Sequence, residues 1–194
     1  MAKLIAMDVA ILPPPDVSAR MMALSAALPQ DSHDLRLDDE HLPHITLTQQ
    51  FVREDELDAV CDHIDGVLRG LPAPRLVATG AGKEGHTIWI AIERTPELMA
   101  LHERLMDALR GLERPEGTPS AFFDHDARLA DVLWVSGFRL KSSFGAYEPH
   151  ITLGHGDEPP SIESFTFDAT AVGACHLGRH CTCRRVLRDW TLRS

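Results

Sequence analysis

The chain has 194 residues, of which 44% are hydrophobic and 25% are charged, an ordinary composition for a globular protein. This length allows one substantial domain or two closely joined lobes. The formal net charge of −10 argues against binding long duplex nucleic acid, which needs a basic surface, but a nucleotide or an RNA terminus needs only a few local cations. No apolar stretch approaches the roughly 20 residues that cross a bilayer, and residues 1–12 lack the features of a signal peptide. We therefore expect a cytoplasmic protein with no membrane partner.

Hydrophobic periodicity and turn residues predict the elements along the chain. Strands are expected at 4–12, 43–52, 75–79, 87–92, 132–140, 151–153, 165–175 and 181–192. Helices are expected at 16–28, 54–68 and 96–112, and a long loop at 113–131. The short links 80–85 and 177–179 favour antiparallel pairing. The pattern predicts an α+β fold, in which mainly antiparallel sheets are flanked by helices.

One pentapeptide, Pro-His-Ile-Thr-Leu, occurs twice, at 43–47 and at 149–153. In a strand, residues i and i+2 point to the same face about 6.6 Å apart. His44 and Thr46 should therefore face one way, while Ile45 and Leu47 face a core, and the second copy should behave alike. A hydroxyl can donate to a phosphate oxygen while the imidazole reaches an attacking or leaving oxygen. The repeats divide the chain into two halves, each expected to supply one such strand.

This pair of motifs resembles the 2H phosphoesterase superfamily, whose hallmark is two His-x-Thr-x motifs in one chain. The matching residues are His44-Ile45-Thr46-Leu47 and His150-Ile151-Thr152-Leu153, and the similarity of element order extends over most of the chain. The family includes RNA 2′,3′-cyclic phosphodiesterases that are also called 2′-5′ RNA ligases. The resemblance implies a single bilobal domain over residues 1–194, with two pseudo-symmetric lobes and a central cleft.

The resemblance also implies that His44 and His150 are catalytic and that Thr46 and Thr152 bind the substrate phosphate. One imidazole would accept a proton from water or a ribose hydroxyl, and the other would deliver one to the leaving oxygen. The sequence leaves open which does which. No metal and no cofactor are expected, because hydroxyls and an imidazolium can meet the phosphate charge. His155, Tyr147 and Phe51 are candidate substrate contacts, and His155 stands near the position where related sequences place an arginine.

The expected activity is hydrolysis of a 2′,3′-cyclic phosphate or a 2′-5′ phosphodiester, at an RNA end or in a small nucleotide, with 2′-5′ ligation as the reverse reaction. One alternative is a phosphodiesterase for another small molecule, such as a cyclic phosphate of ADP-ribose. Another is a module that binds nucleotides or RNA ends without catalysis. We expect a monomer whose partner is its nucleotide or RNA-terminal substrate.

A second cluster of chemistry-bearing residues is Cys-His-x3-His-Cys-x-Cys, between Cys175 and Cys183. Cysteine and histidine are zinc ligands, but the spacing departs from the usual Cys-x2-Cys pattern. The alternative is a β-hairpin whose apolar positions happen to be cysteines. The sequence favours the hairpin and leaves the zinc site open.

Overall fold

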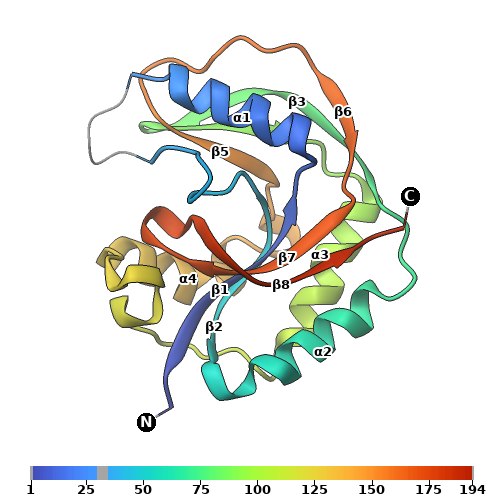
Figure 1. Ribbon diagram of the computed structural model, residues 1–194, viewed down its shortest axis with the longest axis vertical. Coiled ribbons are helices and arrows are strands. Elements are labelled where there is room, and N and C mark those ends of the chain that lie inside the picture. The colour runs from blue at the N-terminus through green and yellow to red at the C-terminus, as the bar shows by residue number, and fades with distance from the viewer. Residues whose placement is uncertain (1, 30–34, 194) are drawn as a thin grey trace.

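The computed structural model describes residues 2–29 and 35–193, and these residues form two four-stranded antiparallel sheets with helices packed against them (Figure 1). The first sheet has the order β2-β1-β7-β8 and contains β1 (Leu4–Leu12), β2 (Ile45–Arg53), β7 (Ala171–Leu177) and β8 (Cys183–Thr191). The second has the order β5-β4-β3-β6 and contains β3 (Arg75–Glu84), β4 (Thr87–Ile92), β5 (His150–His155) and β6 (Phe165–Asp168). The predicted α+β fold is confirmed.

Four α-helices are present in the described part of the chain: α1 (Pro15–Ala27), α2 (Leu57–Leu68), α3 (Pro96–Leu109) and α4 (Leu129–Lys141). Helix α1 packs on β5 of the second sheet, whereas α3 and α4 pack on β2 of the first. Helix α2 lies against α3 and β8. In the described ranges, no helix combines the length and the apolar character that crossing a membrane requires.

Each sheet places one copy of the repeated pentapeptide on an edge strand, β2 in the first sheet and β5 in the second. The repeats suggested that successive halves of the chain would each supply one motif strand, but the two sheets are not successive halves of the chain. The first sheet takes β1 and β2 from the beginning of the sequence and β7 and β8 from its end, while the second sheet comes from the middle (Figure 1). The motifs nevertheless occupy equivalent positions, because both sheets put their motif strand at an edge.

The segment 132–140, predicted as a strand, is helical in the structure and belongs to α4. Its buried residues Val132, Val135 and Phe138 recur at helical spacing, and the two valines join a core cluster with residues of the first sheet. The carboxylate of Asp131 accepts the backbone N–H of Arg128 at 2.8 Å and so caps the helix start. Valine and aromatic residues favour strands, and exposed Leu133 and Leu140 obscure the helical pattern in the sequence.

The predicted terminal hairpin is present but shorter than expected. Strands β7 and β8 pair with each other, whereas β6, which the prediction placed in the same strand as β7, pairs with β3 in the second sheet. Residues 169 and 170 carry the chain from one sheet to the other. In the other predicted hairpin, β3 continues to Glu84, and Gly85, at a φ of +58°, leads the tight turn into β4.

Candidate active site

Both motif strands contain a β-bulge at the same position of the repeated sequence. In β2, Thr46 pairs with Ala10 and Thr48 with Val9, so Leu47 is the extra residue. In β5, Thr152 pairs with Trp89 and Gly154 with Ile88, so Leu153 is the extra residue. Bulges re-aim side chains and are frequent beside active sites. Here each copy of the motif has its bulge at the residue that follows the threonine.

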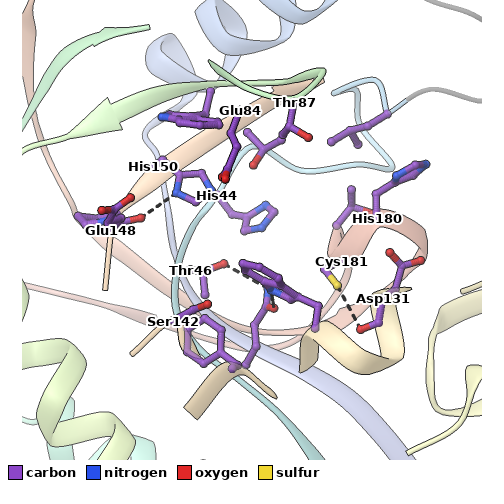
Figure 2. Close-up of a pocket in the computed structure, with 18 of the residues that line it drawn as sticks. His44, Thr46, Glu84, Thr87, Asp131, Ser142, Glu148, His150, His180 and Cys181 are labelled. Atoms are coloured by element: carbon purple, nitrogen blue, oxygen red, sulfur yellow. Dashed lines mark hydrogen bonds between the residues drawn. The ribbon is translucent and has the colours of Figure 1, made fainter. Parts of the chain in front are cut away.

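The alternation predicted from the sequence is present in both copies. Ile45 and Leu47 are fully buried, as are Ile151 and Leu153. The histidines and threonines between them remain partly exposed and line one cavity of about 1000 Å³. Figure 2 shows His44, Thr46 and His150 at this cavity. The structure therefore brings together the four residues of the two motifs from two different sheets.

Both motif histidines are held by the same backbone contact. The Nδ1 of His44 lies 2.8 Å from the carbonyl oxygen of Leu42, and the Nδ1 of His150 lies 2.7 Å from that of Glu148. A carbonyl oxygen can only accept a hydrogen bond, so Nδ1 carries the hydrogen in each ring. In a neutral ring Nε2 is then the basic nitrogen. The two imidazoles thus present the same nitrogen for proton exchange.

The environments of the two histidines differ in charge. Burial lowers the pKa of His150, and the nearby His44 lowers it further, which favours the neutral form. The His44 Nε2 instead lies 3.9 Å from the Oδ2 of Asp8, a carboxyl group that is fully buried on β1. His150 therefore favours the neutral imidazole, whereas His44 has a carboxyl group beside its ring.

Asp8 also organises Thr46. Its Oδ2 accepts hydrogen bonds from the Thr46 hydroxyl at 2.7 Å and from the Gln49 side chain at 2.8 Å. The indole N–H of Trp134, on α4, donates to the Gln49 amide oxygen at 2.9 Å. Burial raises the pKa of Asp8, against the opposing effects of His44 and of the hydrogen bonds from Gln49 and Thr46. Sequence reasoning missed Asp8 as a site residue, although a charge inside the apolar run of residues 4–12 was a visible signal.

Two aromatic side chains support the backbone of the first motif. The Tyr147 hydroxyl donates to the carbonyl oxygen of Thr46 at 2.7 Å, and the Nδ1 of His102 donates to that of Leu47 at 2.6 Å. The two rings stack with centroids 3.9 Å apart. The bulge takes Leu47 out of the ladder, and His102 gives its carbonyl a partner. Burial lowers the pKa of His102 and raises that of Tyr147, so both stay neutral.

The three predicted substrate contacts have different outcomes. His155, the last residue of β5, lines the cavity, and its ring packs edge-on against His180 with centroids 5.2 Å apart. Tyr147 lines the cavity wall, but its hydroxyl is used by Thr46. Phe51 cannot contact a substrate there, because it is fully buried against Phe122. The sequence predicted one solvent-facing side for β2, whereas both faces of the strand are covered at this end.

Cationic side chains that the sequence did not single out also line the cavity. Arg94 follows β4, while Arg128 and Lys141 lie at the two ends of α4. Asp131 accepts a hydrogen bond from the Arg128 guanidinium at 2.6 Å. These local cations stand against the negative net charge of the whole chain. Three carboxylates line the cavity as well, so its lining is closer to neutral than the chain as a whole: Glu84, Asp131 and Glu148.

The cysteine-rich segment does not form a metal cluster of its own. Cys175 and Cys183 are buried and Cys181 is partly exposed, and all carry free thiols. Burial raises the pKa of Cys181 and of Cys183 well above the ordinary value, so neither is an activated nucleophile. Among the residues that the structure describes, one grouping brings three side chains of ligand type together: ligand atoms of Cys183, Asp8 and His44 lie within 4.8 Å of one another. The hairpin prediction holds for the backbone of this segment.

Comparison with known protein families identifies the superfamily of the chain. The sequence family described as the 2′-5′ RNA ligase superfamily matches residues 13–171. The chain belongs to this superfamily. The resemblance to 2H phosphoesterases that the two motifs indicated is thereby confirmed. No curated protein sequence matches the chain.

Solved structures with the same fold match the chain over almost its whole length. TT0787 of Thermus thermophilus is 17% identical, with a TM-score of 0.66 over 97% of this chain and 98% of that one. Escherichia coli LigT, crystallised with NADP+, is 18% identical, with a TM-score of 0.63 over 99% and 100%. LigT with 3′-AMP gives 18% and 0.62 over the same shares. At these identities the likeness is one of fold.

Proposed function

We propose that the protein is a phosphodiesterase that acts without a metal on a 2′,3′-cyclic phosphate or a 2′-5′ phosphodiester, at an RNA end or in a small nucleotide. The reverse reaction would join a 5′-hydroxyl to a cyclic phosphate. One observation carries the proposal: two histidines with the same tautomer face one cavity from two sheets. A binding site alone has no need of two titrating groups arranged in this way.

The surroundings of the two rings suggest their roles in hydrolysis. His150, whose pKa is lowered by burial, is suited to act as the general base that takes a proton from water. His44, whose Nε2 lies 3.9 Å from Asp8, is suited to act as the imidazolium that protonates the leaving ribose oxygen. Water then adds to phosphorus as the bond to that oxygen breaks. General acid–base catalysis of this type contributes about 10²–10⁴-fold to a rate.

The two threonines would hold the phosphate. Thr46 donates to Asp8 in the present structure, so its hydroxyl hydrogen must turn to the phosphate oxygen when substrate binds. Gln49, which also donates to Asp8, keeps that carboxyl group partnered. A hydrogen bond to a charged group contributes about 1.5–3 kcal/mol, so Thr46→Val or Thr152→Val should cost roughly 10–150-fold in kcat/KM.

The size and lining of the cavity bear on the substrate. A volume of about 1000 Å³ is at the upper end for small-molecule sites and leaves room beyond a single phosphate. The fold relative LigT has been crystallised with 3′-AMP and with NADP+, which supports nucleotides as the ligand class. A cyclic phosphate of ADP-ribose remains the second candidate, because the cavity has room for a dinucleotide-sized molecule.

The test is turnover of 2′,3′-cyclic mononucleotides, a 2′-5′ dinucleotide and ADP-ribose cyclic phosphate in buffer containing a chelator. His44→Ala and His150→Ala should each lose at least about a hundredfold in kcat. The double variant should be little worse than either single one, because the pair acts as a unit. His63→Ala, an exposed histidine on α2, is the matched control and should keep full activity. Full turnover by either motif variant, or binding of every substrate without product, would refute the proposal.

A further inference from the structure

Three side chains that commonly ligate metals meet beside the first motif. They are Asp8 of β1, His44 immediately before β2, and Cys183 at the start of β8. One ligand atom from each lies within 4.8 Å of the other two. Asp8 and Cys183 are fully buried, whereas His44 reaches the cavity. The cluster therefore lies in the cavity floor and is reached through His44.

Backbone contacts fix this meeting. The N–H of Leu42 donates to the carbonyl oxygen of Cys183 at 2.9 Å, which joins the segment before β2 to the start of β8. The same Leu42 accepts the Nδ1–H of His44. Asp8 is held in place by β1, which pairs with β2 on one side and with β7 on the other. The cluster is thus part of the folded framework rather than an encounter of long, mobile side chains.

A second observation points to a ligand at this cluster. The Oδ1 of Asp8 is buried and has no hydrogen-bond partner among the residues described. Its other oxygen, Oδ2, already accepts two hydrogen bonds, from Thr46 and Gln49. A buried carboxyl oxygen without a partner is unfavourable, and a bound cation would supply the missing interaction.

We propose that Asp8, His44 and Cys183 form a binding site for Zn²⁺, with a fourth coordination position open to the cavity. Oxygen, imidazole nitrogen and thiolate sulfur are all zinc ligands, and a thiolate together with an imidazole disfavours Mg²⁺ and Ca²⁺. The Cys183 thiol releases its proton to solvent when the metal binds. Tetrahedral zinc needs ligand atoms roughly 3.3–3.6 Å apart, so the three side chains must close by at most about 1.5 Å from their present positions.

The surroundings already resemble those of a metal site. Ligating histidines almost always donate their second ring N–H to a carbonyl or carboxylate, and His44 donates Nδ1–H to Leu42. This leaves Nε2 as the ligand atom. The ligating carboxylate is expected to be hydrogen-bonded as well, and Asp8 receives hydrogen bonds from Thr46 and Gln49.

The consequence for activity rests on the proposed function. The Nε2 of His44 cannot bind zinc and carry a catalytic proton at the same time. Zinc is therefore an inhibitor of this enzyme, and it would compete with the phosphate at the same end of the cavity. Within the cysteine-rich segment between Cys175 and Cys183, only Cys183 is a ligand of the proposed zinc site.

The test measures metal binding separately from activity. Chelator-treated protein is titrated with Co²⁺, and thiolate ligation is read from the thiolate-to-cobalt charge-transfer absorption in the near ultraviolet. The wild-type protein and Cys181→Ser should show the band, and Zn²⁺ should abolish it. Cys183→Ser should lose the band. Asp8→Asn, which keeps an oxygen for Thr46 and Gln49, should weaken Co²⁺ binding by at least roughly 10–100-fold and serves if Cys183→Ser does not fold.

Activity is measured on the same proteins with a 2′,3′-cyclic nucleotide. Zn²⁺ should inhibit the wild type and the control Cys61→Ser, whose buried thiol lies on α2. Cys183→Ser, compared with its own rate in metal-free buffer, should resist inhibition. Absence of a charge-transfer band in the wild type, or an unchanged band in folded Cys183→Ser, would overturn the zinc site. A band without any turnover would refute the proposed function and leave the metal site in place.

Discussion

His102 connects the backbones of the two motif regions, and its replacement gives a direct measure of that connection. It is fully buried on α3. Its Nδ1 donates to the carbonyl oxygen of Leu47 at 2.6 Å, and its Nε2 accepts the backbone N–H of Phe144 at 2.8 Å. Leu47 is the bulged residue of the first motif, and Phe144 lies six residues before His150. The contact with Phe144 requires the neutral imidazole, because a protonated ring has no acceptor.

The variant His102→Leu leaves both backbone groups without their partner. An unsatisfied buried group costs about 1–3 kcal/mol. The Leu47 carbonyl is in the core, whereas Phe144 is partly exposed and can recover some hydration. We therefore expect a loss of about 2–4 kcal/mol in the free energy of unfolding, a large share of the 5–15 kcal/mol that is typical of a folded protein.

The pH dependence of stability should change as well. Burial lowers the pKa of His102 below its ordinary value of 6.5, so in acid the unfolded chain binds a proton before the folded one does. The stability that neutral His102 contributes is complete above pH 6.5 and is lost as the pH falls through the pKa of His102 in the folded protein. The wild type should lose this stability on acidification, and His102→Leu should lose less.

Urea unfolding at a series of pH values measures both effects. His63→Leu is the matched control, because His63 also donates Nδ1–H to a carbonyl, that of Ala59, but is exposed on α2; it should change stability by less than about 0.5 kcal/mol. If His102→Leu were as stable as His63→Leu, the support of the bulged carbonyl would contribute nothing and the reasoning would fail.

Three further predictions concern the cavity and its floor. Asp8→Asn should gain stability relative to the wild type as the pH rises in chelator-containing buffer, because burial raises the pKa of Asp8 and the wild type must bury a charged carboxylate at pH values above that pKa. A difference in unfolding free energy that stays constant with pH would contradict this. The acid limb of the kcat/KM profile should have its midpoint below 6.5, since the pKa of His150 is lowered and a general base must be neutral; a midpoint above that value would exclude His150 as the base. Gly82→Ala should lower kcat/KM by about 3- to 100-fold, because its Cβ would lie 2.7 Å from the Trp89 indole nitrogen and Trp89 flanks the ring of His150. The control is Gly66→Ala on α2, which has open space around the new Cβ; equal kcat/KM values for the two variants would refute the argument.

The repeated pentapeptide predicted the motif strands because the relevant information is local. Its alternation of apolar and polar residues marks a strand with one buried face, and two copies predict two equivalent strands. Helix α4 shows where this reasoning stops. Val132, Trp134 and Val135 are residues that strands favour, and the capping contact of Asp131 becomes visible only with the backbone in place.

The supporting residues of the site could not be predicted for a different reason. Asp8 meets Thr46 because of the register of β1 against β2, and that register shifts at the bulge. Nothing in the neighbourhood of residue 8 records that shift. His102 lies 55 positions from Leu47, and its place depends on how α3 packs on β2. The sequence shows that Asp8 is unusual within an apolar strand, but it does not show which side chains hydrogen-bond to its carboxyl group.

The interleaved make-up of the first sheet has a consequence for biosynthesis. Both pentapeptides have been translated by residue 153, yet β7 and β8, which complete that sheet and hold Leu42 through Cys183, are still to come. A prematurely terminated product would carry every hallmark of the superfamily and lack half of the platform beneath its first imidazole. Possession of both motifs is therefore a poor guide to competence in shortened forms of this protein.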